Sequence, residues 1–467
     1  MSAVDCRNIP LRREAPGELP RSSHLRRNPR HAVPIERIGP DVRIHPAGPV
    51  AGDATLPGSK SLTNRYLICT ALADGESTLR GASFADDAAA MLAALQQLGL
   101  QVTTHPARGE IHVAGCRGNL PADDADLNVG HAGTAMRFLT ALVCLGYGRY
   151  RLDGSPRMRQ RPIGGLVDAL CTLGAQIGYE LTEGCPPLTV LARGLTGGEV
   201  VFDTPPSSQY ISALLMVAPY AKRDVLIRVE GPVVSEPYID MTIDVMRSLG
   251  VELLESEARR FIVPAFQRYQ PGSYAIEPDA SAATYFWAAA ALTGGRVRTR
   301  GLTRASRQGD VAFVDVLARM GCTVEEDDAS LAVAGPRGRL AGISVDLNAM
   351  PDTVQTLAVV ALFADGPTEI RNVANLRIKE TDRLAALGTE LARLGARVEL
   401  RPDGLTVHPP PHIAPAAIQT YADHRMAMSF ALAGLVADGV TIQDAACVSK
   451  SFPAFFESLA ALGPRSP

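Results

Sequence analysis

A sixfold internal repeat, with a period of roughly 70 to 76 residues, constrains the fold of this 467-residue chain more than any other feature. In each copy an amphipathic stretch ends at a glycine, and these glycines are Gly99, Gly174, Gly250, Gly321, Gly395 and Gly463. A glycine directly after such a stretch is typical of a helix C-terminus, and in five of the six copies we expect a short strand to follow. Solenoid repeats usually span about 20 to 50 residues, so the longer period favours two globular lobes of three units each.

Upstream of each repeat glycine the pattern predicts a second, more apolar helix. The expected starts of these helices are Ser59, Gly133, Ser207, Asp279, Asp352 and Asp423. Helix N-termini attract anions, because their free N–H groups and the helix dipole point outward. The sequence therefore predicts an anion site that is assembled from several of these helix starts.

Strand-like runs rich in Val, Ile, Leu and Thr lie between the helices of each unit, for example EVVFDTP and DVLIRVEGP. Each unit is thus expected to combine strands with two helices, which gives the chain an α/β character. The Pro- and Gly-containing stretch at residues 261–278 divides the six units into three and three, and we interpret it as a crossover between two lobes.

Composition and charge exclude several classes of protein. The formal net charge of −3 argues against a general nucleic-acid binder, which is usually strongly basic. The eight cysteines are scattered without a CxxC pair, which favours free thiols in a reducing compartment over disulfides or zinc. No apolar run approaches the ~20 residues that span a bilayer, and no signal-peptide core follows the N-terminus. We expect a cytoplasmic enzyme with no membrane, nucleic-acid or metal partner.

Residues 1–40 form a separate segment rich in Arg and Pro. An Arg-rich leader that contains serines could be an organelle transit peptide. Its acidic residues (Asp5, Glu14, Glu18 and Glu36) and its prolines argue against the amphipathic helix that such a peptide needs. We therefore expect a disordered N-terminal extension or a start codon assigned too early.

The first expected helix start carries the strongest anion-binding pattern. In LPGSKSLTNR, Lys60 lies one helical turn before Asn64 and Ser61 one turn before Arg65. Two cations, a hydroxyl and free backbone donors at one helix N-terminus suit a phosphate monoester. A Walker A loop is not formed, because Ser59 separates the glycine from Lys60. The alternative is a helix start with solvated surface charges.

Two further starts carry weaker patterns. Gly133 in VGHAGTAMR allows close backbone approach to a ligand, and the loop that follows contains three arginines: Arg157, Arg159 and Arg161. Arginines in a short loop are more often solvated, although two prolines stiffen this one. At the third start, Ser207, Ser208 and Gln209 offer polar donors, with a simple serine N-cap as the alternative.

The segment 376–395 contains a carboxylate on an apolar helix face. If the helix begins by about Lys379, then Glu380 falls within the leucine stripe that ends at Leu394 and faces inward toward a cleft. A carboxylate held there between two cations is a candidate catalytic group. Asp352 is either an N-cap or a second catalytic carboxylate.

The last expected helix start holds a cation in an apolar setting. Arg425 lies in the first turn of an otherwise apolar helix, so it needs a partner or a ligand. We interpret the neighbouring His424 as a structural, hydrogen-bonded histidine rather than a base. Lys450 is expected in a loop before the final helix. Residues with the spacing of metal ligands are not found in the sequence.

Eight motifs from about residue 45 to the C-terminus resemble the 5-enolpyruvylshikimate-3-phosphate synthase family. They are LPGSKSLTNR, HAGTAMR, PRMRQRPIGGLVDAL, SSQYISALLM, SEPYIDMT, DASAATYF, RIKETDRL and DHRMAM. The resemblance implies the α/β (α+β), two-lobed enolpyruvyl transferase fold. Each lobe would hold three βαβαββ units with helices packed inside the sheets, and the active site would lie in the interlobe cleft. The implied lobes are 41–58 with 279–467 (lobe I) and 59–278 (lobe II).

The resemblance also implies site residues, with no cofactor and no metal. The implied 3-phosphoshikimate contacts are Lys60, Ser61, Arg65, Ser207, Ser208, Gln209, Ser235, Asp352, Asn375 and Lys379. The implied phosphoenolpyruvate contacts are Lys60, Gly133, Arg157, Gln209, Arg383, Arg425 and Lys450. Asp352 and Glu380 match the proton-transfer residues, and Lys60 joins them as a catalytic residue. The chain departs from the family pattern at His131, Phe138 and Gln160, where Asn, Pro and Glu are usual.

The implied reaction transfers the enolpyruvyl group of phosphoenolpyruvate to the 5-hydroxyl of 3-phosphoshikimate, in a monomer. One alternative is the related transferase that acts on UDP-N-acetylglucosamine, but that enzyme has Asn where this chain has Ser61 and carries a catalytic cysteine in a mobile loop. The other alternative is an inactive binding homologue, against which the intact Lys60, Asp352, Glu380 and Arg425 argue.

Overall fold

The fold is described by a computed structural model over residues 33–257 and 259–464. Most of the predicted N-terminal extension, residues 1–32, lies outside the described residues. The prediction that the extension reaches residue 40 is wrong, because strand β1 (Ile35–Ile38) pairs with β2 (Asp41–Ile44). On its other side β2 pairs with β26 (Val440–Ile442), so this hairpin is part of a sheet completed by the far end of the chain.

Three sheets built mainly from residues 76–275 share one topology, in which a parallel pair is followed by two antiparallel strands. The first sheet orders β15 (Ser273–Ala275), β4 (Glu76–Arg80), β6 (Glu110–Ala114) and β5 (Gln101–His105). The second orders β7 (Asp124–Asn128), β8 (Tyr147–Asp153), β10 (Leu188–Arg193) and β9 (Ile177–Tyr179). The third orders β11 (Gly198–Asp203), β12 (Val225–Glu230), β14 (Arg260–Val263) and β13 (Glu255–Glu257).

Three more sheets repeat this topology with strands from both ends of the chain. One orders β17 (Thr323–Asp327), β18 (Ser330–Ala334), β16 (Arg296–Arg300), β3 (Val50–Ala54) and β27 (Gly463–Pro464). Another orders β20 (Ser344–Asp346), β22 (Thr368–Arg371), β24 (Gly404–His408) and β23 (Arg397–Arg401). The last orders β1, β2, β26 and β25 (Ala416–Ile418), and β19 (Leu340–Ala341) pairs separately with β21 (Ala364–Asp365). Six similar sheets are the structural form of the sixfold repeat.

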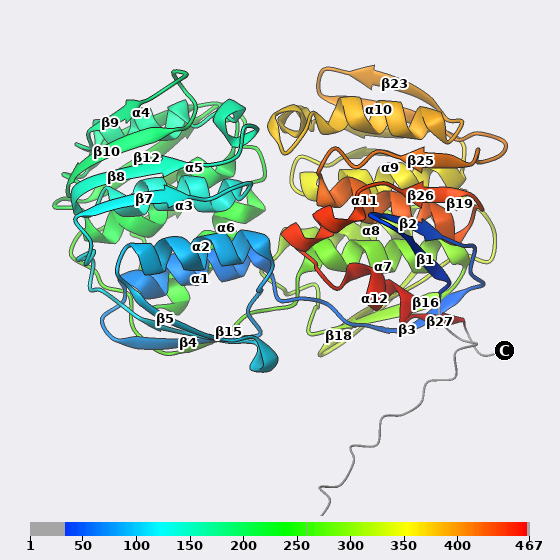
Figure 1. The fold of residues 1–467 in the computed structure, drawn as a ribbon, viewed down its shortest axis with the longest axis horizontal. Coiled ribbons are helices and arrows are strands. Elements are labelled where there is room, and N and C mark those ends of the chain that lie inside the picture. The colour runs from blue at the N-terminus through cyan, green and yellow to red at the C-terminus, as the bar shows by residue number, and fades with distance from the viewer. Residues whose placement is uncertain (1–32, 258, 465–467) are drawn as a thin grey trace, which may run out of the picture. The chain divides into compact units, whose positions relative to one another are not determined.

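Two sets of helices are packed among these sheets (Figure 1). The more deeply buried set is α1 (Lys60–Leu72), α3 (Gly133–Val143), α5 (Ser208–Val217), α7 (Ala280–Thr293), α9 (Val354–Val360) and α11 (His424–Ala431). The amphipathic set is α2 (Asp86–Gln97), α4 (Gly164–Thr172), α6 (Pro237–Ser248), α8 (Phe313–Arg319), α10 (Arg383–Arg393) and α12 (Phe455–Ala460). Every residue of α1 from Leu62 onward is buried, so this helix lies inside the sheets, whereas α2 exposes one face.

The repeat glycines have the backbone conformation that a helix C-terminus requires at five of the six positions. Gly99, Gly174, Gly250, Gly321 and Gly395 have φ between +80° and +105°, a region that side chains disfavour. Gly463 differs, because it lies in β27, which pairs with β3.

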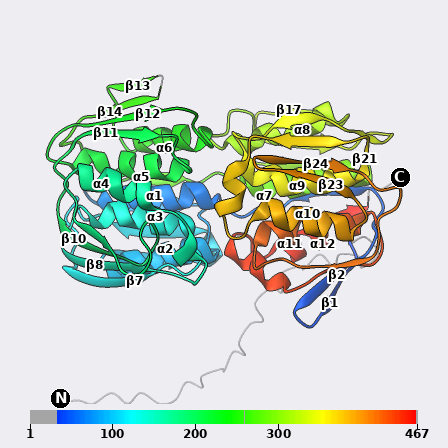
Figure 2. The ribbon, with the colours of Figure 1, turned by 90° about the horizontal axis from the view of Figure 1, so that it is seen from above.

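The buried apolar residues form two separate cores, one in each of the two lobes of the ribbon in Figure 2. One core is built from residues 62–276, and the other from residues 33–50 together with residues 280–462. Two connections join them side by side, where Gly58 and Pro278 form a β-bridge. The predicted crossover at 261–278 includes most of β14 and all of β15, which belong to the first of these cores, so only its last residues, after Ile276, connect the lobes.

Within residues 33–257 and 259–464, the structure has no helix with both the length and the apolarity required to cross a membrane.

Candidate active site

Five of the six predicted helix starts line one cavity between the two lobes. Caps formed by the preceding residue fix several of these starts: Ser59 Oγ accepts from Leu62 N at 3.3 Å, and Asp423 Oδ1 accepts from Arg425 N at 2.9 Å. The sixth start, at Asp279, lies behind the cavity. Its Oδ1 caps α7 at Ala282 N (2.8 Å), while its Oδ2 accepts from Lys60 N (3.1 Å). Asp279 therefore joins the start of α7 to the start of α1.

The lining of this cavity carries more positive than negative charge. Among the described residues, six cationic side chains line it: Lys60, Arg65, Arg161, Lys379, Arg383 and Arg425. Three carboxylates line it as well: Asp87, Asp352 and Glu380. Because the chain as a whole is acidic, this local excess of cations marks a site for anionic ligands.

Asp352 lies in the 3-10 turn η6 (Pro351–Thr353) and does not act as the N-cap that was considered. Its Oδ2 accepts from Arg425 at 2.6 Å, and its Oδ1 accepts from Arg383 at 3.2 Å. Burial by itself would raise the pKa of Asp352, but Arg425, Lys379 and the other cations lower it below its usual range. Asp352 is therefore ionised at neutral pH.

Glu380 does face the cavity, but the predicted reason is wrong. Helix α10 begins at Arg383, with Asp382 as its N-cap, so Glu380 precedes the helix rather than lying on its apolar face. Cations surround its carboxylate: Arg383 lies at 3.0 Å, Arg161 at 3.6 Å and Lys450 at 3.7 Å. Burial raises the pKa of Glu380, but these cations outweigh that effect and hold it well below its usual range.

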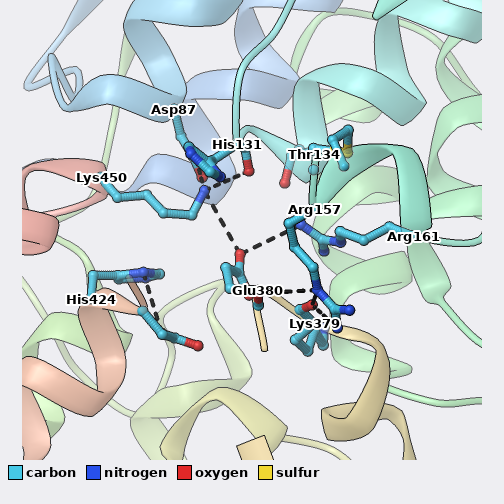
Figure 3. Close-up of polar contacts among 12 residues, drawn as sticks. Asp87, His131, Thr134, Arg157, Arg161, Lys379, Glu380, His424 and Lys450 are labelled. Carbon is cyan, nitrogen blue, oxygen red and sulfur yellow. Dashed lines mark hydrogen bonds and ion pairs between the residues drawn. The ribbon is translucent and has the colours of Figure 1, made fainter. Parts of the chain in front are cut away.

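A second group of charges adjoins Glu380 (Figure 3). Lys450 donates to a carboxylate oxygen of Asp87 and to the backbone oxygen of His131, the latter at 2.8 Å. Lys60 reaches Asp87 as well, at 3.2 Å. Lys450 lies in the 3-10 helix η10 (Ala445–Lys450) of one lobe, whereas Asp87 and His131 belong to the other, so these contacts cross the cleft.

Arg161 lines the cavity, although sequence reasoning did not select it over its neighbours. Its guanidinium lies so close to Gly133 that a Cβ there would be 2.6 Å from Nη1. Arg157, which was selected, lies beside the cavity and donates to the backbone oxygens of Lys379 (2.9 Å) and Glu380 (3.1 Å) (Figure 3). The contact between Arg161 and Gly133 is what distinguishes Arg161 from the other arginines of the loop. It joins residues 28 positions apart, so the local sequence pattern does not reveal it.

All ten residues predicted to bind 3-phosphoshikimate line the cavity, and Arg65 is the most deeply placed cation among them. Arg65 donates to the hydroxyl of Thr242 (2.7 Å) and to the backbone oxygens of Ser61 and Tyr238 (both 3.0 Å), which are neutral acceptors. Burial lowers the pKa of Arg65 to about 10, still well above neutrality. A buried cation with neutral partners favours an anionic ligand nearby.

The remaining members of this group also line the cavity, namely Ser207, Ser208, Gln209, Ser235, Asn375 and Lys379. Burial lowers the pKa of Lys379 to about 8, although the Asp352 carboxylate opposes that effect. Tyr238 lines the same cavity and was missed, because the motif SEPYIDMT was noted without assigning a role to its tyrosine.

His424 differs from its expected role. Its side chain is fully buried, and neither ring nitrogen has a hydrogen-bond partner among the residues that the structure describes. The expectation of a hydrogen-bonded structural histidine is therefore wrong. Burial and the nearby Arg425 hold the pKa of His424 well below its usual range, so the ring is neutral.

Across the described ranges, the side chains of His, Cys, Asp and Glu form no group of three or more that could hold a metal ion. The charged groups of the cavity pair with one another instead, which suits ligands that bring their own phosphate and carboxylate groups.

Comparisons with known proteins agree with one another. A sequence model of the family described as EPSP synthase (3-phosphoshikimate 1-carboxyvinyltransferase) matches residues 44–459. A 3-phosphoshikimate 1-carboxyvinyltransferase from Nostoc sp. is 50% identical over 408 residues, which is 87% of this chain and 96% of that protein. The protein of the same name from Photobacterium profundum is 46% identical over 421 residues, or 90% and 98% of the two chains.

A solved structure of EPSP synthase from Acinetobacter baumannii has a TM-score of 0.75 to this chain at 26% sequence identity. The match covers 90% of this chain and 98% of the other. Similarity in both sequence and fold thus extends over nearly all of the described chain.

Proposed function

The chain belongs to the EPSP synthase family, and we propose how its cleft performs the reaction of that family. The enzyme is a 3-phosphoshikimate 1-carboxyvinyltransferase of the shikimate pathway to aromatic amino acids. It transfers the enolpyruvyl group of phosphoenolpyruvate to the 5-hydroxyl of 3-phosphoshikimate and releases phosphate. The excess of cations in the cavity carries the proposal, since each substrate has both a phosphate and a carboxylate.

The 3-phosphoshikimate end is assigned to the group around Arg65. The ligands proposed for this substrate are Lys60, Ser61, Arg65, Ser207, Ser208, Gln209, Ser235, Asp352, Asn375 and Lys379. The positive ends of the helix dipoles at the starts of α1 and α5, together with these hydroxyls and cations, favour a phosphate monoester. Gln209 donates from Nε2 to the Thr134 hydroxyl at 3.1 Å, which holds its amide at the boundary between the two substrates.

The phosphoenolpyruvate end is assigned to the cations around Glu380. The ligands proposed are Lys60, Gly133, Arg157, Gln209, Arg383, Arg425 and Lys450, and we add Arg161 because it lines the cavity. Arg383 is fully buried and contacts Asp352, Glu380 and Asp423. Asp423 accepts twice, at 2.7 Å and 3.2 Å, so four contacts with three carboxylates hold the planar guanidinium in one orientation, ready for a carboxylate or phosphate.

Asp352 acts as the base in this proposal. It takes the proton of the 5-hydroxyl as that oxygen attacks C2 of phosphoenolpyruvate. Its lowered pKa keeps it ionised and able to accept a proton, although it also makes it a weak base while Arg425 contacts it. A substrate phosphate that attracts Arg425 would restore basicity at the moment of attack. The proton then passes to the departing phosphate, so Asp352 ends ionised.

Glu380 acts as the acid, and it delivers a proton to the methylene carbon to form a tetrahedral adduct. It recovers a proton from the resulting methyl group when phosphate leaves, so it begins and ends the cycle protonated. The cations that lower its pKa in the unliganded cleft must therefore be engaged by substrate first. Two bound anions neutralise Arg383, Arg161 and Lys450, which raises the pKa of Glu380 and allows it to hold its proton.

The wider setting is also a proposal. The seven cysteines of the described chain are free thiols, which is consistent with a cytoplasmic location. The net charge of −3 supports small anionic substrates rather than nucleic acid. We take the working form to be a monomer, with lobe I formed by residues 33–58 and 279–464 and lobe II by residues 59–257 and 259–278. The two separate cores support this division.

The proposal is tested by measuring phosphate release from phosphoenolpyruvate with one acceptor at a time. We expect release with 3-phosphoshikimate and none with UDP-N-acetylglucosamine. Release with the sugar nucleotide alone would assign the chain to the related transferase, and no release with either acceptor would identify an inactive binding homologue.

A further inference from the structure

One short segment of lobe II, residues 235–238, lies directly against lobe I at the 3-phosphoshikimate end of the cavity. Ser235 N donates to the backbone oxygen of Asn348 at 3.1 Å. A Cβ on Gly309 would be only 2.7 Å from Cβ of Pro237, so the two backbones meet without room for a side chain. Next to this contact, the Tyr238 hydroxyl donates to Asp310 Oδ2 at 3.3 Å.

Asp310 is a buried carboxylic acid that the proposed mechanism does not use. It lies in the 3-10 turn η5 (Gly309–Ala312), and its side chain is 2% exposed. The Ser281 hydroxyl donates to the same oxygen, Oδ2, as does Tyr238. Oδ1 has no hydrogen-bond partner among the described residues. A buried carboxyl oxygen without a partner destabilises a fold, so its presence here calls for a functional reason.

The charged surroundings of Asp310 come from four elements. Tyr238 faces it from α6, Ser281 from α7, Asp279 from the N-cap of α7, Asp352 from η6 and Arg425 from α11. Burial and the Asp352 carboxylate raise the pKa of Asp310 to about 6, while Ser281 and Arg425 oppose that change. The carboxylate form thus prevails at pH 7 to 8 and the neutral acid below pH 6.

Tyr238 connects this acid to the substrate end. Tyr238 is one of the residues that line the cavity, and its backbone oxygen accepts from Arg65 at 3.0 Å. The O–H bond of Tyr238 can rotate about its C–O bond, so without a strong acceptor the hydroxyl hydrogen would have no fixed orientation. A carboxylate acceptor fixes that direction more strongly than a neutral one, because charge-assisted hydrogen bonds are roughly twice as strong.

We propose that Asp310 is a positioning residue for 3-phosphoshikimate: its carboxylate reaches across the lobe boundary and holds the Tyr238 hydroxyl in place at the substrate cavity. The inference rests on the proposed function of that cavity. Asp310 does not touch the substrate, and it acts through Tyr238 and through the seam formed by residues 235–238 with residues 309–310.

The proposal and a purely structural role predict opposite effects of Asp310→Asn. The amide keeps the shape and can accept from Tyr238 and Ser281, but it carries no charge. A carboxyl group whose pKa is raised in the folded state contributes stability that is lost as the pH rises through that pKa. The Asp310 carboxylate therefore does not stabilise the fold at pH 8, and replacing it with a neutral amide should not lower the melting temperature there. Substrate binding, however, should weaken, because Tyr238 loses its charged acceptor.

The experiment measures the dissociation constant of 3-phosphoshikimate by calorimetry from pH 5 to pH 8.5, for the wild type and Asp310→Asn. The substrate phosphate titrates equally in both proteins, so the ratio of the two constants isolates Asp310. We expect weaker binding by about five- to tenfold for the variant at pH 8, falling to no difference at pH 5. Ser281→Ala removes a hydrogen-bond donor that stabilises the Asp310 carboxylate. In this variant the pH-dependent change in affinity that Asp310 causes should therefore have its midpoint at a higher pH than in the wild type.

Two further variants keep the test independent of folding defects. Tyr238→Phe should weaken binding by a similar factor, and adding Asp310→Asn to it should have no further effect. Asp315→Asn, an exposed carboxylate of α8 paired with Arg304, is the matched control and should bind like the wild type.

A ratio that stays near one at every pH, or additive effects of the Tyr238 and Asp310 substitutions, would overturn the proposal. A lower melting temperature of Asp310→Asn at pH 8 together with unchanged binding would assign it a structural role only. If the wild type releases no phosphate with either acceptor, the proposed function fails instead, and this result is distinguishable because it concerns the unmodified enzyme.

Discussion

Replacing Glu380 with Gln tests the proton donor by itself, because the amide keeps the shape of the side chain but cannot deliver the acidic proton. A positioned general acid contributes about 10²- to 10⁴-fold to a rate. At 1.36 kcal/mol per factor of ten, this corresponds to about 2.7 to 5.4 kcal/mol of the activation barrier. We therefore expect kcat to fall by at least 100-fold.

The electrostatics of the site predict that substrate affinity does not fall with it. At 3.0, 3.6 and 3.7 Å from the carboxylate, Arg383, Arg161 and Lys450 each interact with it by about 4 to 6 kcal/mol at an effective dielectric constant of 20, before the opposing cost of burial is counted. The neutral amide releases these cations to the substrate anions. The KM for phosphoenolpyruvate should stay constant or decrease.

Initial rates of phosphate release at several phosphoenolpyruvate concentrations separate kcat from KM. Glu457→Gln is the control, since Glu457 is exposed and its ion pair with Arg37 is of the surface kind that contributes little. A kcat within threefold of the wild type, or a raised KM with unchanged kcat, would refute the role of Glu380 as proton donor.

Three other variants follow from the same geometry. Asp352→Asn should lower kcat by ~100-fold or more through loss of the base. Because cations hold the pKa of Asp352 low, the stability that this carboxylate contributes is present above the unfolded pKa of about 3.9 and is lost as the pH falls. The free energies of unfolding of wild type and variant, measured with urea and Trp287 fluorescence, should therefore differ more at pH 7 than at pH 3. Arg161→Met should raise the KM for phosphoenolpyruvate about 10- to 100-fold, whereas Arg159→Met, which removes a half-exposed partner of Asp153 in the same loop, should leave it nearly unchanged in the same assay. Since burial lowers the pKa of Lys379 to about 8, binding of 3-phosphoshikimate should weaken as the pH rises through 8 and Lys379 loses its charge. In calorimetry, the dissociation constant of Lys379→Met should show no such change near pH 8. A change of equal size in both proteins would contradict the assignment.

The helix starts could be predicted from sequence because their causes are local. Ser59 and Asp279 cap the residues three positions ahead of them, so each start is encoded within four residues. The repeat glycines were equally accessible, since a left-handed residue after an amphipathic stretch needs no distant partner. Only Gly463, which pairs across a sheet, departs from the pattern.

The site itself was predictable only in part, because long-range contacts decide which side chains enter it. Glu380 was identified through a helix that begins four residues later than expected, and cations from both lobes surround its carboxylate in the cavity. Arg157 and Arg161 are four residues apart in one loop, and only the contact with Gly133 distinguishes them. The pair Tyr238 and Asp310 joins the two lobes across 72 positions, which no local pattern reveals.

The most direct test of the mechanism follows hydrogen at the methylene carbon of phosphoenolpyruvate. If Glu380 protonates that carbon and later removes a proton from the methyl group, turnover in D2O should place deuterium in the vinyl position of the product, and also in phosphoenolpyruvate recovered before completion. Mass spectrometry of both molecules after partial reaction measures this. A product formed at the normal rate but free of deuterium would show that the carbon is never protonated, and it would contradict the account of the cleft given above.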